Sequence, residues 1–150
     1  WELGRRGLAR ALETGGTYAF ETTLGAKTIP DMLIKGAISG AEIHIWFAGL
    51  ASPELHIERV QARVAAGGHP IPEAKIRERY ITSRQNLIRL LPHFASLRVY
   101  DNSEDNDPKQ GARPEPVLVL HMANGRIELA AETVPQWAKA IVMAAMRAQA

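Results

Sequence analysis

The apolar positions of this chain recur in two periods, and their order along the sequence predicts an α/β fold. Spacing of three or four residues between apolar positions predicts helices over 1–13, 28–40, 53–66 and 73–91, and a last helix capped by 133–136. Short β-branched, aromatic or aliphatic runs predict strands at 17–22, 42–49, 96–101, 117–121 and 126–130. Helices that alternate with strands in this way are typical of a sheet covered by helices.

Capping and turn residues locate several of these boundaries. Ser52-Pro53-Glu54 combines an N-cap serine, a proline at the first helical position and an acid in the first turn. Gly15-Gly16 and Gly67-Gly68 are helix stops, and the polar, proline-rich stretch 103–116 predicts a loop. Asn124-Gly125 between two apolar runs predicts a β-hairpin.

The strands at 17–22, 42–49 and 96–101 are predicted to be neighbouring parallel strands of one sheet. Helices separate them along the chain, as parallel strands require. Two of the predicted strands are almost entirely apolar, as expected when helices cover both faces of a sheet. Trp46 is therefore assigned to the core, and Trp137 is assigned as the anchor of the last helix.

The composition indicates one globular domain over residues 1–150, with 46% hydrophobic and 23% charged residues. The absence of cysteine excludes a disulfide scaffold and a cysteine nucleophile, and the histidines lack metal-ligand spacing, so no metal site is expected. No apolar run approaches the roughly 20 residues of a membrane-spanning helix, and the first residues do not resemble a signal peptide. We expect a cytoplasmic protein without membrane contact. Trp1 in place of Met indicates a cut or processed chain.

Basic residues are concentrated in one part of the chain, although the formal net charge is only +2. They are Arg59, Arg63, Lys75, Arg77, Arg79, Arg84, Arg89 and Arg98. Such a stretch suggests a local anionic ligand, and the alternative is a solvated helix face. Binding to nucleic acid is not expected, because the tryptophans and tyrosines are not interleaved with these cations.

Three phrases of the sequence follow one another in a recognisable order. They are Phe20-Glu21-Thr22-Thr23-Leu24, the stretch from Ser52 to Ser83, and Val99-Tyr100-Asp101-Asn102-Ser103. The fixed residues of the middle phrase are Ser52-Pro53-Glu54-Leu55, Arg59, Arg63, Gly67-Gly68-His69, Ile71-Pro72, Ile76-Arg77, Arg79-Tyr80 and Ser83. In type and spacing the three phrases resemble the zeta-toxin family of P-loop kinases over residues 5–103.

The resemblance implies a parallel-sheet fold and an ATP-dependent phosphotransferase. In that family a glycine-rich loop holds ATP with Mg²⁺, and the phosphoryl group passes to a hydroxyl of a small molecule, a UDP-amino-sugar in the characterised toxins. The expected partners are a nucleotide, a small-molecule substrate and, for a toxin–antitoxin system, an antitoxin protein.

The chain departs from the family at the phosphate-binding loop. No Gly-x-x-x-x-Gly-Lys-Ser/Thr motif occurs, and the nearest approach, Gly25-Ala26-Lys27-Thr28, has Ala26 and Phe20 where the two glycines should be. The family's aspartate base also belongs to a segment before residue 1. The expected fold is therefore an α/β P-loop kinase-like domain without its N-terminal strand, P-loop and helix, ending in a β-hairpin and a helix.

Three arginines are the candidate catalytic cations. Arg59 and Arg63 lie one helical turn apart and leave one helix face together, and Arg79 borders the apolar face of the next helix. Guanidinium groups suit the charge that spreads over oxygens in phosphoryl transfer. The predicted lid is the segment of about 59–80, with Gly67-Gly68 as its hinge. The alternative is that these are solvated surface arginines.

Polar residues at strand ends are the candidate binding groups. The resemblance assigns Glu21 to substrate hydroxyls, Thr23 to a neighbouring hydrogen bond and Asn102 to the nucleotide. The alternatives are a capping or ion-paired carboxylate at Glu21 and a plain turn at Asn102.

Three interpretations of function follow. The first is a small-molecule kinase, represented here by its lid and substrate-side region. The second is a degenerate, non-catalytic member of the same fold that binds a nucleotide or a protein. The third is a fragment that functions only with a separate P-loop polypeptide.

We predict that these 150 residues neither hydrolyse ATP nor transfer its γ-phosphate at a measurable rate. A triphosphate must be held by several backbone N–H groups and a lysine, with a Ser/Thr hydroxyl on Mg²⁺, and the sequence lacks that loop. Titration calorimetry with Mg-ATP and a phosphate-release assay measure both properties. Micromolar binding with turnover that Arg63→Ala abolishes would contradict the prediction.

Overall fold

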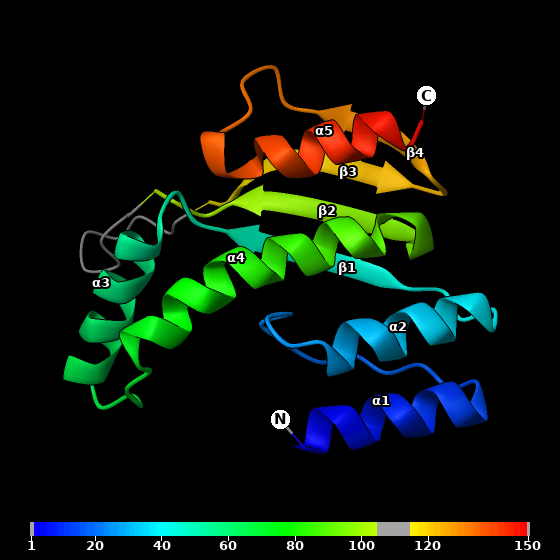
Figure 1. The fold of residues 1–150 in the computed structure, drawn as a ribbon, viewed down its shortest axis with the longest axis horizontal. Coiled ribbons are helices and arrows are strands. Elements are labelled where there is room, and N and C mark those ends of the chain that lie inside the picture. Colours follow the sequence, from blue (N-terminus) through cyan, green and yellow to red (C-terminus); the bar gives the residue numbers. More distant parts are fainter. Residues whose placement is uncertain (1, 105–114, 150) are drawn as a thin grey trace.

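The computed structural model describes residues 2–104 and 115–149, which form one sheet with helices packed on it (Figure 1). The elements in chain order are α1 (Glu2–Thr14), α2 (Thr28–Ile38), β1 (His44–Gly49), α3 (Pro53–Ala65), α4 (Glu73–Leu90), η1 (Leu91–His93), β2 (Ser96–Asp101), β3 (Val117–Ala123), β4 (Arg126–Ala130), η3 (Gln136–Ala138) and α5 (Lys139–Arg147). The helix–strand order predicted from periodicity is confirmed from α2 to β4. Most of the predicted loop 103–116 lies outside the described residues.

The sheet is mixed, with the strand order β1-β2-β3-β4. β1 and β2 are parallel, and α3 and α4 connect them. β2, β3 and β4 are antiparallel neighbours. Asn124 and Gly125 form the turn between β3 and β4 with φ angles of 50° and 76°, as a two-residue hairpin turn requires. The predicted hairpin and the parallel pairing of 42–49 with 96–101 are confirmed, whereas the predicted parallel sheet is corrected to a mixed sheet with one parallel and two antiparallel pairs.

Residues 17–22 are not a strand, which corrects the prediction of three neighbouring parallel strands. The segment is irregular and mostly exposed. The Tyr18 and Phe20 rings stack with centroids 5.5 Å apart, and Tyr18 lies against Gly7 of α1. A strand persists only where a neighbouring strand satisfies its backbone N–H and C=O groups. Among the described residues no strand pairs with this segment, so its β-branched and aromatic composition is not sufficient.

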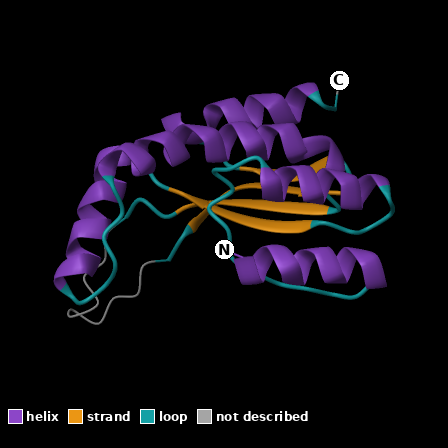
Figure 2. Cartoon of the chain, turned by 60° about the horizontal axis from the view of Figure 1, so that its bottom comes forward, coloured by secondary structure: helices purple, strands orange, loops and turns teal. Residues whose placement is uncertain are grey.

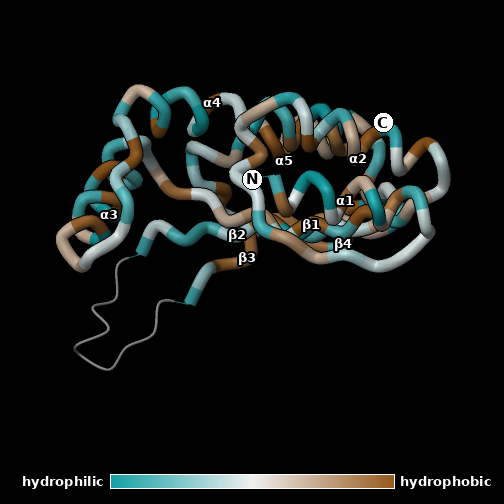
Figure 3. The backbone as a smooth tube through the Cα atoms, turned by 90° about the horizontal axis from the view of Figure 1, so that it is seen from below, coloured by the Kyte–Doolittle hydropathy of each residue, from teal (hydrophilic) through white to brown (hydrophobic). Residues whose placement is uncertain are grey.

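The hydrophobic core lies on one face of the sheet. Leu97 of β2 and Leu120 of β3 are fully buried together with Leu87 of α4 and Ile141 of α5. Figures 2 and 3 show α4 and α5 together on one side of the strands, with α3 extending from one end of the molecule. The burial of these side chains against a single helical layer holds α4 in place, and α4 in turn carries Arg79.

The opposite face is open at β1, and this corrects the assignment of Trp46 to the core. Trp46 is 67% exposed. Side chains alternate between the two faces of a strand, so Ile45 and Phe47 are half-buried on the core side and Trp46 lies on the other. An almost continuous apolar run indicates burial only when both faces are covered, and β1 is covered on one.

The end of β2 is joined to the last helix by Trp137. The indole Nε1 donates to Oδ1 of Asp101 at 3.1 Å, and the ring packs on Gly49 at the end of β1. The same Asp101 oxygen accepts hydrogen bonds from the Ser103 backbone N–H and hydroxyl. Trp137 therefore anchors the last helix to the sheet, and this prediction is confirmed. The predicted cap at 133–136 is wrong, because the 3₁₀ turn η3 begins after Pro135 with no side-chain cap.

We predict that Gly49→Ala destabilises the protein by about 2 kcal/mol or more, because a Cβ there would overlap the buried Trp137 ring. A planar ring cannot move aside as a flexible chain does. Urea unfolding followed by circular dichroism gives the change in free energy. Gly16→Ala is the matched control, since the nearest atom to its Cβ would be the exposed Thr14 hydroxyl at 3.3 Å. Equal stability of the two variants would contradict this packing.

Candidate functional site

A cleft of about 460 Å³ lies between the first turn of α1, residues 20–26 and the first half of α4. Its lining residues are Gly4, Arg5, Phe20, Glu21, Thr22, Thr23, Gly25, Ala26, Ile29, Lys75, Glu78 and Arg79. Three residues predicted from the sequence, Glu21, Thr23 and Arg79, therefore line one cleft, although Arg79 is distant from the other two along the chain.

Two side chains of α4 hold the loop that carries Glu21 and Thr23. The buried Asn86 amide donates to the Leu24 carbonyl at 2.7 Å and to the Ala26 carbonyl at 3.3 Å. The Thr82 hydroxyl donates to the Gly25 carbonyl at 2.9 Å. Leu24 has a φ of 53°, an uncommon conformation for this residue type. These bonds to three consecutive carbonyls keep the loop in that conformation and so fix one wall of the cleft.

Arg79 passes directly over this loop. A Cβ at Gly25 would lie 2.8 Å from Cγ of Arg79, so only glycine allows the arginine stem to pack this closely. Thr22 supports the same turn, because its hydroxyl accepts a hydrogen bond from the Leu24 backbone N–H at 3.1 Å. The loop and α4 therefore position Glu21 and Arg79 relative to each other.

The charged groups of the cleft differ in their partners. Lys75 Nζ binds Glu78 Oε2 at 2.7 Å, and this hydrogen bond lowers the pKa of the Glu78 carboxyl. Arg5 binds Glu2 within α1. The side chains of Glu21 and Arg79 make no hydrogen bond or ion pair with any residue that the structure describes. A carboxylate and a guanidinium in one cleft are thus free to bind a ligand that has both a donor and an anionic group.

The predicted cations on α3 lie elsewhere. Arg59 Nη1 donates to the Asn102 carbonyl at 2.7 Å, and its Nη2 donates to the Ser103 and Glu104 carbonyls at 3.3 and 3.1 Å. The Arg63 side chain is exposed and makes no hydrogen bond or ion pair with the described residues. Arg59 and Asn102 are therefore brought together, but neither they nor Arg63 line the cleft.

Arg84 is a half-buried cation whose role the sequence did not show. Its Nη2 donates to the Leu50 carbonyl at 3.2 Å, and its guanidinium carbon lies 3.4 Å from the Tyr80 ring centroid and 5.2 Å from that of Trp137. Burial lowers the pKa of Arg84. The pKa of nearby His56 is also lowered, because its imidazole is partly removed from water and the positive charges of Arg84 and Arg59 repel its protonated form. Arg84 joins α4 to the end of β1, and its signal in the sequence was only a charge beside an apolar helix face.

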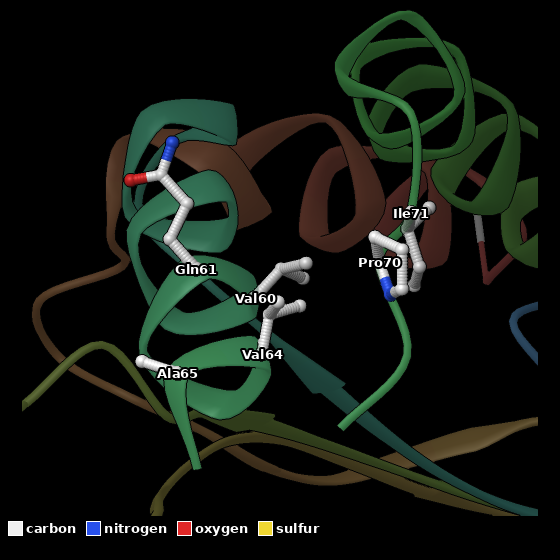
Figure 4. Close-up of a pocket in the computed structure, with 6 residues that line it drawn as sticks. All are labelled: Val60, Gln61, Val64, Ala65, Pro70 and Ile71. Atoms are coloured by element: carbon white, nitrogen blue, oxygen red, sulfur yellow. The ribbon is translucent and has the colours of Figure 1, made fainter. Parts of the chain in front are cut away.

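The predicted lid segment, about 59–80, contains an apolar groove of about 350 Å³ (Figure 4). It is lined by Val60, Gln61, Val64, Ala65, Pro70 and Ile71. Arg77 of α4 links this helix to α3, because its guanidinium binds Glu54 of α3 at 2.6 Å. The same guanidinium binds Glu73 of α4 at 2.7 Å. The groove has no titratable group in its lining and therefore offers no chemistry of its own.

Comparison with known proteins gives one partial match. An uncharacterized protein of Haemophilus influenzae is 30% identical over 63 residues, which are 42% of this chain and 45% of that protein. No protein-family profile matches the chain, and no solved structure matches it. No helix within residues 2–104 and 115–149 is long and apolar enough to cross a membrane, and no group of three potential metal-binding side chains occurs there.

We predict that Asn86→Ala destabilises the protein by about 1–3 kcal/mol, because it leaves the Leu24 carbonyl without its buried donor. Hydrogen exchange of residues 20–26 should also accelerate, since the loop loses its attachment to α4. The matched control is Gln85→Ala, an exposed neighbour on the same helix, with an expected change below about 0.5 kcal/mol. Unchanged exchange in the loop of Asn86→Ala would show that this amide does not hold the cleft wall.

Proposed function

We propose that this chain is the acceptor-binding part of an ATP-dependent kinase that phosphorylates a hydroxyl of a small molecule. The cleft between α1, residues 20–26 and α4 is the acceptor site. The family resemblance at Glu21, Thr23 and Arg79 supports the proposal, together with the fold, which is α/β with a parallel pair of strands. The partial match to the Haemophilus influenzae protein names no activity.

The observation that carries the proposal is the pair formed by Glu21 and Arg79. They lie in the same cleft, and neither has a hydrogen bond or ion pair with another described residue. Both side chains are exposed in one cleft, so a single ligand with a donor and an anionic group can reach both of them.

The two groups have complementary roles in the acceptor site. The Glu21 carboxylate accepts a hydrogen bond from the substrate hydroxyl and so orients its oxygen, while the Thr23 hydroxyl provides a second donor or acceptor. Arg79 supplies a planar fork of donors for an anionic oxygen and offsets negative charge at the reacting group. The substrate is thereby bound and oriented by this chain's own residues.

The described residues do not fit a triphosphate with Mg²⁺. Gly25-Ala26-Lys27-Thr28 does precede α2, but Arg79 packs on Gly25, and the carbonyls of residues 24–26 are held by Thr82 and Asn86. A phosphate-binding loop also needs glycines that let its backbone surround the phosphates, and Ala26 and Phe20 stand at those positions. We therefore derive no step through ATP or Mg²⁺, and the phosphoryl donor is no part of this site.

A non-catalytic binding protein of the same fold is the second candidate. It is favoured by Arg59, whose Nη1 and Nη2 donate to backbone carbonyls of residues 102–104. An arginine held in this way supports the loop after β2 rather than a transferred phosphoryl group. In this alternative the cleft binds its ligand and no transfer follows.

We predict that UDP-N-acetylglucosamine, a hydroxyl compound of the class that the resemblance implies, binds to this cleft. Glu21→Gln and Arg79→Gln should each weaken binding about tenfold or more, because each removes a charge-assisted hydrogen bond. Titration calorimetry measures the dissociation constants. The matched controls are Glu13→Gln and Arg10→Gln, which change exposed residues of α1 outside the cleft and should leave binding unchanged.

Two results would reject the acceptor site. One is the absence of binding by the unaltered chain. The other is equal weakening in Glu13→Gln and Glu21→Gln. Binding that depends on Glu21, with no phosphorylated product when a P-loop polypeptide and Mg-ATP are added, would favour the non-catalytic candidate.

A further inference from the structure

The first turn of α1 contributes a cation to the cleft that the sequence did not single out. Arg5 lines the cleft together with Gly4 and with the loop that carries Glu21. Its side chain is 37% exposed, whereas the neighbouring Arg6 is 73% exposed and is absent from the lining. Two adjacent arginines thus differ in their surroundings, and only one faces the proposed ligand.

Glu2 holds Arg5 by one side of its guanidinium. Nε donates to Oε2 of Glu2 at 3.2 Å, and Nη2 donates to Oε1 at 2.7 Å. No residue that the structure describes accepts a hydrogen bond from Nη1. A guanidinium held along its Nε–Nη2 edge keeps its Nη1–Nη2 end available as a fork of donors, the geometry that binds two oxygens of one anion.

The balance of charge around this arginine favours an anion. Glu2 is shared, because it also accepts a hydrogen bond from Arg6 Nε at 3.0 Å, so a single carboxylate faces two guanidiniums. In the same lining Glu78 is bound to Lys75 and is also attracted by the charge of Arg79, whose own side chain makes no hydrogen bond or ion pair with the described residues. The cleft lining thus contains the cations Arg5, Lys75 and Arg79 and the carboxylates Glu21 and Glu78, so its positive charge is largely but not fully offset.

We propose that Arg5 is a specificity-determining residue that binds an anionic group of the acceptor, a phosphate or a carboxylate, through its Nη1–Nη2 end. This inference rests on the proposed function, because it takes the cleft to be the acceptor site. Glu21 then selects for a hydroxyl and Arg5 for a negative charge on the same molecule. Glu2 is the positioning residue that keeps Arg5 directed at the cleft.

The first experiment tests Arg5 without any acceptor. Inorganic pyrophosphate is titrated into the full chain at low ionic strength, and binding is measured by calorimetry and by the NMR shift of the Arg5 Nε–H. We expect Arg5→Gln to weaken binding about tenfold and Arg6→Gln to weaken it less than twofold. The matched pair separates the two roles of Arg5, since both arginines bind Glu2 but only Arg5 lines the cleft. Equal effects of the two substitutions, or no Arg5 shift, would overturn the inference.

The second experiment links Arg5 to the acceptor. N-acetylglucosamine 1-phosphate and N-acetylglucosamine differ only in the anionic group. The unaltered chain should prefer the phosphate about tenfold, and Arg5→Gln should reduce this preference to near one while binding of the neutral sugar stays the same. Equal binding of both sugars by the unaltered chain would overturn the Arg5 inference and leave the acceptor site intact. Binding of neither sugar, with pyrophosphate still dependent on Arg5, would instead reject the proposed sugar-type acceptor and support Arg5 as an anion-binding residue.

Discussion

The hydrogen bonds from α4 to the loop 24–26 are the constraint on which the cleft depends. Asn86 and Thr82 donate from one helix to three consecutive carbonyls, and these bonds hold Leu24 at a positive φ. Buried carbonyls without donors are costly, so the loop cannot leave α4 without loss of stability. Because the same helix carries Arg79, α4 provides one wall of the cleft and holds the loop that forms the next, while α1 forms the third. The geometry of the proposed site is thus a consequence of the packing of α4.

The packing of α4 depends in turn on a core that covers one side of the sheet. Leu87 and Leu90 of α4 are fully buried, as are Leu97 and Leu120 of the strands beneath them. Trp137 joins this layer to the carboxyl ends of both parallel strands, through Gly49 of β1 and Asp101 of β2. The opposite side of β1 is open, and Trp46 is exposed there. The chain therefore positions its candidate site with a single layer of helices.

The basic residues of the described chain serve two different purposes. Arg59 and Arg84 donate to backbone carbonyls near the ends of β1 and β2, where they join helices to strands. Arg77 of α4 joins this helix to α3 through Glu54, and it also binds Glu73 of its own helix. Arg5 and Arg79 face the cleft. The concentration of positive charge is thus mainly structural, and only the cations without a complete set of acceptors are candidates for a ligand.

The sequence by itself determined most of the helices, the hairpin and three members of the cleft. Those features depend on local chemistry: Ser52 caps α3 through its own hydroxyl, and Asn124-Gly125 adopts the two positive φ angles of its turn. The family resemblance selected Glu21, Thr23 and Arg79, which share the cleft.

What the tertiary structure alone decided concerns partners that are distant in the chain. Residues 17–22 have strand composition but no neighbouring strand, and Trp46 has core composition but no covering layer. Asn86 and Arg5 were missed for the same reason, because a buried amide or a cation acquires its role from the backbone or the cleft it faces, and that pairing is set by packing rather than by spacing along the chain.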